Sequence, residues 1–243
     1  MRIVLYIILT LTVLCFAQCK DELFNGGDTV TKEFRIEEPF NNIEITADFD
    51  IELVQDTVNK AIVTCGENLM NDVQVTSENN NLTLNHNVKY SWSRDYSKIQ
   101  VKLHLKSISY INVRKPCHIF TTDTFKTDNF YFVDWNKFTE MDVCLDVYNL
   151  YVVMSSDNFG RFTLRGKAVN ANLIQWGSAF ILADSMRIEN CNVEHRSAGD
   201  VHVNVAKELK VSLKSIGNVY CSSKPDTVII TEQLSSGKLI FEN

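Results

Sequence analysis

The densest group of residues that could carry out acid–base chemistry lies between positions 194 and 202. It comprises Glu194, His195, Arg196, Asp200 and His202. Inverting hydrolysis of a glycosidic bond needs an acid and a base roughly 6.5–9.5 Å apart. In the repeat register derived below, Asp200 would lie between Ala179 and Asn218 on the neighbouring rungs. Neither of these neighbours carries a second carboxylate. We therefore interpret these residues as solvated polar side chains on an exposed strand, and we predict no enzymatic activity.

Three aromatic residues recur at similar positions relative to turns. Trp135 and Phe159 each lie three residues before the first apolar residue that follows a turn, and Trp176 lies four residues before it. On adjacent strands of a sheet, about 4.8 Å apart, the three would form a ladder. Facing solvent, such a ladder could stack on sugar rings; facing inward, it would fill the core. Trp135, Phe159 and Trp176 are therefore our candidate ligand-stacking residues.

The sequence indicates no metal or cofactor site. The five histidines are scattered, and phosphate-loop, dinucleotide-binding and calcium-repeat motifs do not occur. The net charge is -6 without a basic cluster, so we expect no binding to nucleic acid. Five cysteines lie beyond position 60, in no C-x-x-C pair, which favours buried free thiols. One or two disulfides between stacked turns remain an alternative in an oxidising compartment.

These residues must be positioned by a repeat that runs through the second half of the chain. Small-residue turns recur at the anchors Gly160, Ser178, Gly199, Gly217 and Gly237, with spacings of 18, 21, 18 and 20 residues. Apolar residues alternate on both sides of most turns, which is typical of strands. A period of roughly 20 residues with several short strands indicates a solenoid, because one unit cannot bury its own apolar face. The pattern predicts an all-β protein, a parallel β-helix.

The chain is expected to hold one domain, residues 32–243. Residues 32–106 read as strands and hairpins, and residues 107–243 read as regular rungs. No segment shows a sustained helical period. The segment 89–98 breaks the alternation and contains Tyr90, Trp92 and Tyr96. It is either a cap over one end of the solenoid or an exposed interface loop.

The start of the chain resembles a targeting segment. Arg2 precedes an apolar run that is too short to span a bilayer, which predicts a signal peptide over residues 1–18. Cys19 resembles the acylated cysteine of bacterial lipoproteins, so residues 19–31 would be a lipidated leash that holds the protein on the membrane. The alternative is a plain secretory signal. Lys20, Asp21 and Glu22 resemble an export signal for surface lipoproteins, or simply begin a solvated tether.

Several motifs together resemble the head GIN domain family of auto-transporter adhesins. They are EPFNNIEI at 38–45, DIELVQ at 50–55, GENL at 66–69 with NLTL at 81–84, and the turns SAGDV, SIGNV and SSGKL near the C-terminal end. Asp56 replaces the glycine usual in that family. The resemblance implies a right-handed parallel β-helix with antiparallel elements at its N-terminal end. It supplies no set of catalytic residues.

We therefore predict an outer-membrane lipoprotein, anchored through Cys19 and exposed at the cell surface, that acts as an adhesin-like binding module. Glycans or proteins are its candidate ligands. Two alternatives from other classes stay open: a polysaccharide-active β-helix enzyme, either a lyase or a hydrolase, and a structural envelope module that self-associates.

Overall fold

The computed structural model describes residues 26–88 and 98–242. Within these ranges, one short helix, α3 (Glu67–Met70), accompanies 17 strands in a single sheet system. The strands are β1 (Thr29–Arg35), β2 (Phe40–Ile45), β3 (Asp50–Gln55), β4 (Lys60–Gly66), β5 (Val73–Glu78), β6 (Asn80–His86), β7 (Gln100–Leu105), β8 (Tyr110–Val113), β9 (His118–Phe120), β10 (Phe125–Asp134), β11 (Glu140–Met154), β12 (Arg161–Gly177), β13 (Phe180–Ser197), β14 (Val201–Leu213), β15 (Val219–Cys221), β16 (Thr227–Gln233) and β17 (Leu239–Phe241).

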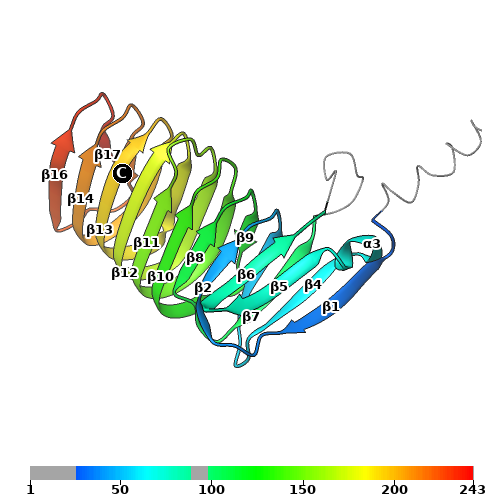
Figure 1. Ribbon diagram of the computed structural model, residues 1–243. Coiled ribbons are helices and arrows are strands. Elements are labelled where there is room, and N and C mark those ends of the chain that lie inside the picture. Colours follow the sequence, from blue (N-terminus) through cyan, green and yellow to red (C-terminus); the bar gives the residue numbers. More distant parts are fainter. Residues whose placement is uncertain (1–25, 89–97, 243) are drawn as a thin grey trace, which may run out of the picture.

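Successive windings of the chain stack in parallel and form a β-helix (Figure 1). The backbone register runs from rung to rung, with Phe132 beside Val152, then Leu173, then Val193. This confirms the predicted all-β solenoid. The long strands β11, β12 and β13 each bend, so their two halves belong to different sides of the coil. We call one side of the coil the first wall; it consists of β6, β2, β8, β10, the second halves of β11–β14, and β16. The opposite side of the coil is the second wall.

The stacking order differs from the chain order at the N-terminal end. Strands β2 and β3 pair in parallel with β8 and β9, so they already form a rung. Residues 60–105 are inserted between these two rungs, and β6 and β7 from the insertion pair with the far sides of β2 and β3. The regular coil therefore includes strands well before residue 107, where the repeat in the sequence suggested that it begins.

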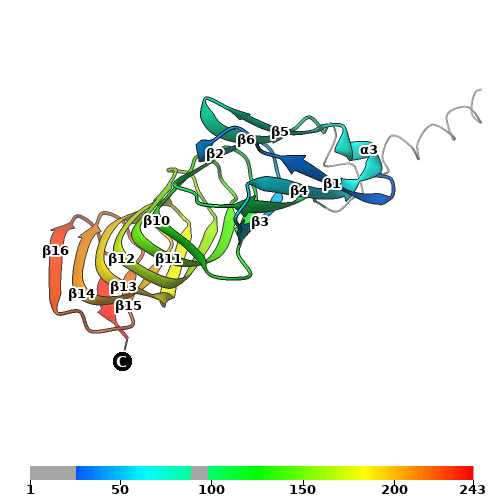
Figure 2. The same ribbon diagram turned by 90° about the horizontal axis from the view of Figure 1, so that it is seen from below.

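Antiparallel strands widen the sheet at this end, as expected from the hairpin pattern (Figure 2). Strand β4 pairs with β7 and β1, and β5 pairs with β6. The helix α3 buries Leu69 and Met70 against the core. Strand β1 corrects the predicted leash, which was expected to extend to residue 31. Thr29–Arg35 pairs with β4 because Val30 packs on the core and Thr31 hydrogen-bonds to Thr64 through their hydroxyls at 3.0 Å.

The interior is a continuous apolar stack, since buried and outward residues alternate along most strands from β2 to β15. Phe130, Phe132, Phe162 and their neighbours are fully buried. The five cysteines beyond position 60 are free thiols, and four of them are buried, Cys144 being partly exposed. Burial raises the pKa of Cys65, so this thiol stays protonated at neutral pH.

Steric contacts between successive turns explain why glycine recurs at these positions. A Cβ atom on Gly199 would lie within 3.0 Å of the Ala179 carbonyl oxygen on the preceding turn, and one on Gly217 would meet the Gly199 carbonyl in the same way. Gly237 stands in the same relation to Gly217. Successive turns therefore pack backbone against backbone, which only glycine permits at these positions.

The bend between the two walls carries a ladder of asparagine side chains. Asn149 donates to Asn129 at 2.9 Å, Asn170 donates to Asn149 at 3.1 Å, and Asn190 donates to Asn170 at 3.2 Å. The four residues occupy matching positions on consecutive rungs. Each amide thus satisfies the next, which fixes the register at the corner of the coil.

Candidate binding face

The outward side of the first wall presents aromatic and aliphatic side chains on consecutive rungs. Because side chains alternate along a strand, the residues between the buried positions of β10, β11 and β12 all point away from the interior. We call this surface the binding face. It consists of Tyr110, Tyr131, Val133, Trp135, Tyr151, Val153, Ser155, Ile174 and Trp176.

Three tyrosines form the first row of the binding face. Tyr110, Tyr131 and Tyr151 pair directly across β8, β10 and β11. The rings of Tyr131 and Tyr151 have centroids 5.8 Å apart and are tilted by 47°. All three side chains are half-buried. Each tyrosine therefore offers a partly exposed aromatic surface next to a phenolic hydroxyl, a combination common at binding interfaces.

An aliphatic row lies beside the tyrosines. Val133, Val153 and Ile174 occupy matching outward positions on three rungs. Val133 is only 7% exposed although it points outward, so neighbouring outward side chains cover it. The row forms an apolar floor between the tyrosines and the next row.

The third row contains two of the three residues predicted to stack on a ligand. The pairing of Asp134 with Met154 and of Val153 with Ile174 places Trp135, Ser155 and Trp176 in one line. Trp135 is 55% exposed, whereas Trp176 is half-buried. The two tryptophans therefore lie two rungs apart, with Ser155 between them. The expected ladder of Trp135, Phe159 and Trp176 on adjacent rungs is therefore wrong, because Ser155 and not Phe159 lies between the two tryptophans.

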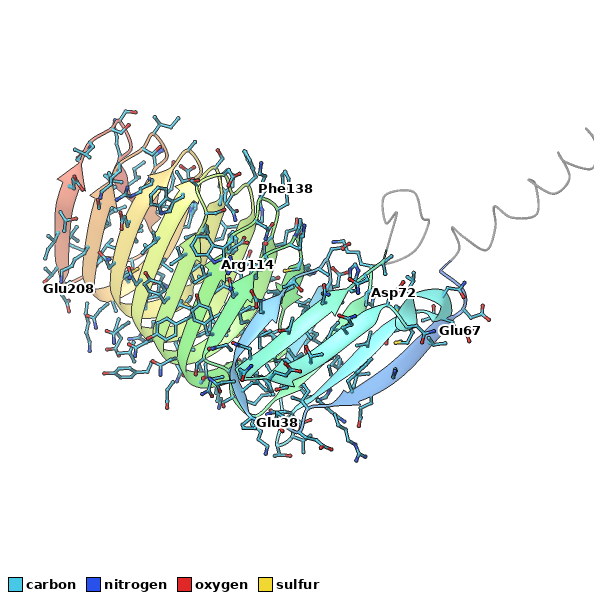
Figure 3. All side chains as sticks on the ribbon, viewed as in Figure 1. Glu38, Glu67, Asp72, Arg114, Phe138 and Glu208 are labelled. Atoms are coloured by element: carbon cyan, nitrogen blue, oxygen red, sulfur yellow. The ribbon has the colours of Figure 1, made fainter. Side chains whose placement is uncertain are left out.

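Phe159 belongs to a different part of the surface. Its backbone nitrogen donates to Lys137, which places it beside Phe138 beyond the turn. The rings of Phe138 and Phe159 stack with centroids 5.8 Å apart, and both are more than half exposed. Figure 3 marks Phe138 at the turn and Arg114 at the end of β8. The Arg114 guanidinium lies 5.7 Å from the centre of the Trp135 ring. Phe159 thus contributes to a separate aromatic pair.

Charged residues border the binding face at both of its ends. On the N-terminal side, Arg114 pairs with Glu44 at 3.4 Å. On the C-terminal side, Glu194 accepts hydrogen bonds from Arg196 at 2.5 Å and Lys214 at 3.3 Å. Burial opposes ionisation of Glu194, but these two cations outweigh it and lower the pKa of the carboxyl. An apolar centre with a charged rim is typical of interaction surfaces.

The structure separates the residues that could have carried out acid–base chemistry. Glu194 and Arg196 lie on the first wall, whereas Asp200 and His202 lie across the turn on the second wall. His202 stacks on Tyr220 with centroids 4.7 Å apart. On the preceding rung Asp200 is in line with Phe180 and not with Ala179, whereas on the following rung it lies beside Asn218 as predicted.

His195 corrects the expectation that this group is solvated. Its side chain is fully buried and its Nε2 atom lies 2.8 Å from the Gly199 carbonyl oxygen, to which it donates. Burial lowers the pKa of His195, so the ring is neutral. Gln175 and Gln233 reach the carbonyl four residues ahead in the same way. His195 therefore holds the turn in place.

A second buried polar group lies inside the turn of the Trp135 rung. The carboxylate of Asp134 accepts hydrogen bonds from the Asn136 backbone at 3.0 Å and from the Asn158 amide at 2.6 Å. Asn136 also bonds to Thr139. Burial raises the pKa of Asp134 to about 6. These bonds support the turn directly beneath Trp135.

Other expected features fall partly beyond what the structure describes. Within residues 26–88 and 98–242, no group of histidine, cysteine or carboxylate side chains is arranged to hold a metal ion. In the same ranges, no helix has the length and apolar character needed to cross a membrane. The predicted signal peptide, Cys19 and the aromatic loop with Tyr90, Trp92 and Tyr96 lie outside the described residues.

The tyrosine row and the aliphatic floor were not predicted from the sequence. Tyr110, Tyr131 and Tyr151 are 21 and 20 residues apart, which is one period of the repeat. Tyr131, Val133 and Trp135 also alternate with buried residues of the same strand. Following outward positions from rung to rung, as well as inward ones, would have found both rows.

The fold and this surface define a β-solenoid module with a flat aromatic face. Over residues 39–225 the chain matches the family model described as "Putative auto-transporter adhesin, head GIN domain". Because this match spans most of the sequence, the chain belongs to the head GIN domain family. No curated protein matches the chain.

Solved structures of bacterial proteins share this fold. A protein described as a "putative adhesin" from Bacteroides fragilis has a TM-score of 0.80 at 18% identity, over 90% of this chain and 99% of that one. A "putative adhesin" from Parabacteroides merdae gives 0.58 at 18% identity, over 90% and 98%. A "putative lipid binding protein" from Parabacteroides distasonis gives 0.65 at 16% identity, over 90% and 99%. At these identities the similarity shows the fold alone.

Proposed function

We propose that the chain is an adhesin-like module of the bacterial cell surface that binds glycans through its binding face and has no catalytic activity. Tyr131, Tyr151 and Trp135 carry the proposal, since the two half-buried tyrosines lie on consecutive rungs and the exposed Trp135 lies beside them on the same wall. Aromatic faces pack against the C–H surfaces of sugar rings, and the regular rung spacing suits a ligand that itself repeats.

The proposal that the module lacks catalysis is supported by the placement of its polar groups. Glu194 is paired with two cations, His195 is buried in a structural hydrogen bond, and Asp200 accepts a bond from the Asn218 backbone at 2.8 Å on the other wall. A general acid and base must reach the same bond of the substrate. Carboxylates divided between two walls are poorly placed for that.

Anchoring to the outer membrane through a lipid on Cys19 completes the proposal. The sequence before residue 26 supports it, because the apolar run from Ile3 to Phe16 is followed shortly by Cys19 and then by three charged residues. Labelling cells with an alkyne fatty acid would test acylation, and Cys19→Ala should abolish the label. Protease treatment of intact cells would test surface display, with Lys20, Asp21 and Glu22 replaced by alanine as the comparison.

Glycan binding can be tested with the lipid-free protein on a glycan array. The double variant Tyr131→Ala/Tyr151→Ala removes the tyrosine row and should lose the binding that the wild type shows. Tyr220→Ala is the matched control, because Tyr220 is a half-buried outward tyrosine that stacks on His202 on the second wall. Equal binding by the wild type and the double variant, or absence of glycan binding by the wild type, would refute the proposal.

A further inference from the structure

The third row of the binding face has a symmetrical order of side chains. It runs Arg114, Trp135, Ser155, Trp176 and Arg196 on five consecutive rungs. The Arg114 guanidinium lies over the Trp135 ring at 5.7 Å from its centroid, and the Arg196 guanidinium lies over the Trp176 ring at 4.6 Å. Each arginine covers the outer face of its indole. The inner faces of both indoles are therefore directed toward the rung of Ser155.

The spacing between the two indoles fits one ring. Two strand spacings, about 9.6 Å, separate the backbones of Trp135 and Trp176. A ring held in van der Waals contact with both indoles needs roughly 7–8 Å, or twice a carbon–carbon contact distance of about 3.5–4.0 Å. The two side chains can close the remaining distance by small rotations about their χ angles. The gap is too narrow for two stacked rings.

The floor of the gap is polar although its sides are aromatic. Ser155 donates its hydroxyl hydrogen to the Asn136 carbonyl oxygen at 3.1 Å. The lone pairs of the Ser155 oxygen remain able to accept a hydrogen bond from a ligand. A planar hydrocarbon ring has no donor for this oxygen. A pyranose ring presents C–H groups on its two faces and hydroxyls along its edge, which matches both the sides and the floor.

We propose that Trp135 and Trp176 form a clamp that holds one pyranose ring of a glycan edge-on over Ser155. This inference rests on the proposed function and specifies its ligand geometry. The tyrosine row then contacts the neighbouring sugar units, whereas the clamp holds a single unit between two rings. The two arginines fix the indoles from outside, because each is itself paired with a carboxylate, Arg114 with Glu44 and Arg196 with Glu194.

Filling the gap distinguishes a clamp from a flat stacking surface. Ser155→Trp would complete a continuous row of three indoles. If sugars only stack on the outside of the face, this variant should bind as well as the wild type or better. If the gap receives a ring, affinity for the hexaoses of glucose and N-acetylglucosamine, or for the array ligand that binds best, should fall about tenfold or more. Ser155→Ala keeps the gap open and should cause only a fall of a few-fold.

Tryptophan fluorescence provides a second readout that does not depend on the Ser155→Trp variant folding. In a Trp92→Phe background, only Trp135 and Trp176 emit. Sugar in the clamp should protect both from acrylamide quenching, as compared in Trp135→Phe and Trp176→Phe variants. Protection of neither residue by a bound oligosaccharide would overturn the clamp. Protection by tyrosine-containing peptides but not by sugars would also overturn it, and would indicate a protein ligand.

The outcomes separate the two proposals. If the wild type binds no sugar, or the tyrosine double variant binds normally, the proposed function fails. If the wild type binds, the double variant does not, and Ser155→Trp binds undiminished, glycan binding stands and the clamp alone fails. Thermal unfolding of each variant verifies that it is folded, and unchanged binding by Tyr220→Ala shows that loss of an outward tyrosine elsewhere has no effect.

Discussion

The guanidinium of Arg196 lies 4.6 Å from the centre of the Trp176 ring, and the same group pairs with Glu194 at 2.5 Å. One side chain thus covers an aromatic face and joins it to a charged network that continues through Lys214 to Glu232 at 3.0 Å. Trp135 has a weaker version of this arrangement, because Arg114 is at 5.7 Å and its ion pair at 3.4 Å. The two ends of the tryptophan row are therefore differently shielded.

This difference predicts unequal effects of removing the two arginines. Arg196→Ala should expose Trp176, red-shift its emission and increase its acrylamide quenching. The stability loss should be about 1 kcal/mol, since exposed cation–π contacts and surface ion pairs each contribute little. Arg114→Ala should change Trp135 less, because that ring is already 55% exposed. Equal changes in quenching at the two tryptophans would contradict the assigned geometry.

The asparagine ladder predicts a graded loss of stability. Asn170 makes two amide bonds, one to Asn149 and one from Asn190, whereas Asn190 makes one such bond. Each net hydrogen bond contributes about 0.5–1.5 kcal/mol. Asn170→Ala should therefore lower the free energy of unfolding by about 1–3 kcal/mol, and Asn190→Ala by about half as much. Urea denaturation of both variants measures this, and equal losses would show that the ladder is not the cause.

The repeat in the sequence was sufficient to predict the coil. Small residues at the turns and alternating apolar positions depend on local geometry, namely close turn packing and strand pleating, and both are visible in one sequence. The rung formed by β2 and β3 was harder to recognise as part of the coil. It stacks on β8 and β9 only because residues 60–105 are inserted between them, and a period cannot be followed across an insertion of that size.

The alignment of side chains near the turns was predictable only in part. The turns differ in length, so the alignment of residues between rungs depends on where counting starts. Counting back from the strand after each turn gives one alignment, and counting forward from the strand before it gives another. Counting back grouped Phe159 with Trp135, whereas the hydrogen bonds follow the forward count and group Ser155 with Trp135 and Trp176. His195 was misjudged for another reason. It lies at an alternate position of the same strand as Cys191 and Val193, so its side chain points inward with theirs, but its polarity suggested exposure.

Asp134 predicts a pH dependence of stability. Burial raises its pKa from 3.8 to about 6, so between these values the folded protein holds a proton that the unfolded chain has lost. The contribution of Asp134 to stability is therefore largest below about pH 4 and declines as the pH rises through 6, by about 3 kcal/mol in total. Asp134→Asn cannot titrate. The stability of the wild type relative to this variant should therefore be higher at pH 4.5 than at pH 7.5.

Chemical denaturation of both proteins at the two pH values measures that difference. Taking the difference cancels the titration of carboxyls elsewhere, such as Asp48, whose pKa is lowered mainly by its hydrogen bond with His86. Asp142→Asn is a suitable control, because Asp142 is an outward, solvent-accessible carboxyl that pairs with Arg165 at 2.6 Å. A relative stability of the wild type that does not change with pH would show that Asp134 titrates normally.

His195 provides the opposite pH dependence at the next turns of the coil. Burial lowers its pKa below 6.5, so the unfolded chain takes up a proton more readily, and the free energy of unfolding falls as the pH falls below that value. Glutamine should replace it well, since Gln175 and Gln233 make the same bond four residues ahead. The free energy of unfolding of His195→Gln should match that of the wild type at pH 7.5 within about 1 kcal/mol and exceed it at pH 5.

His195→Leu leaves the Gly199 carbonyl without this donor and should lower the free energy of unfolding by about 1–3 kcal/mol at pH 7.5. Denaturation at both pH values separates these cases. If leucine were tolerated as well as glutamine, the bond to the turn would not be what keeps this histidine in the core.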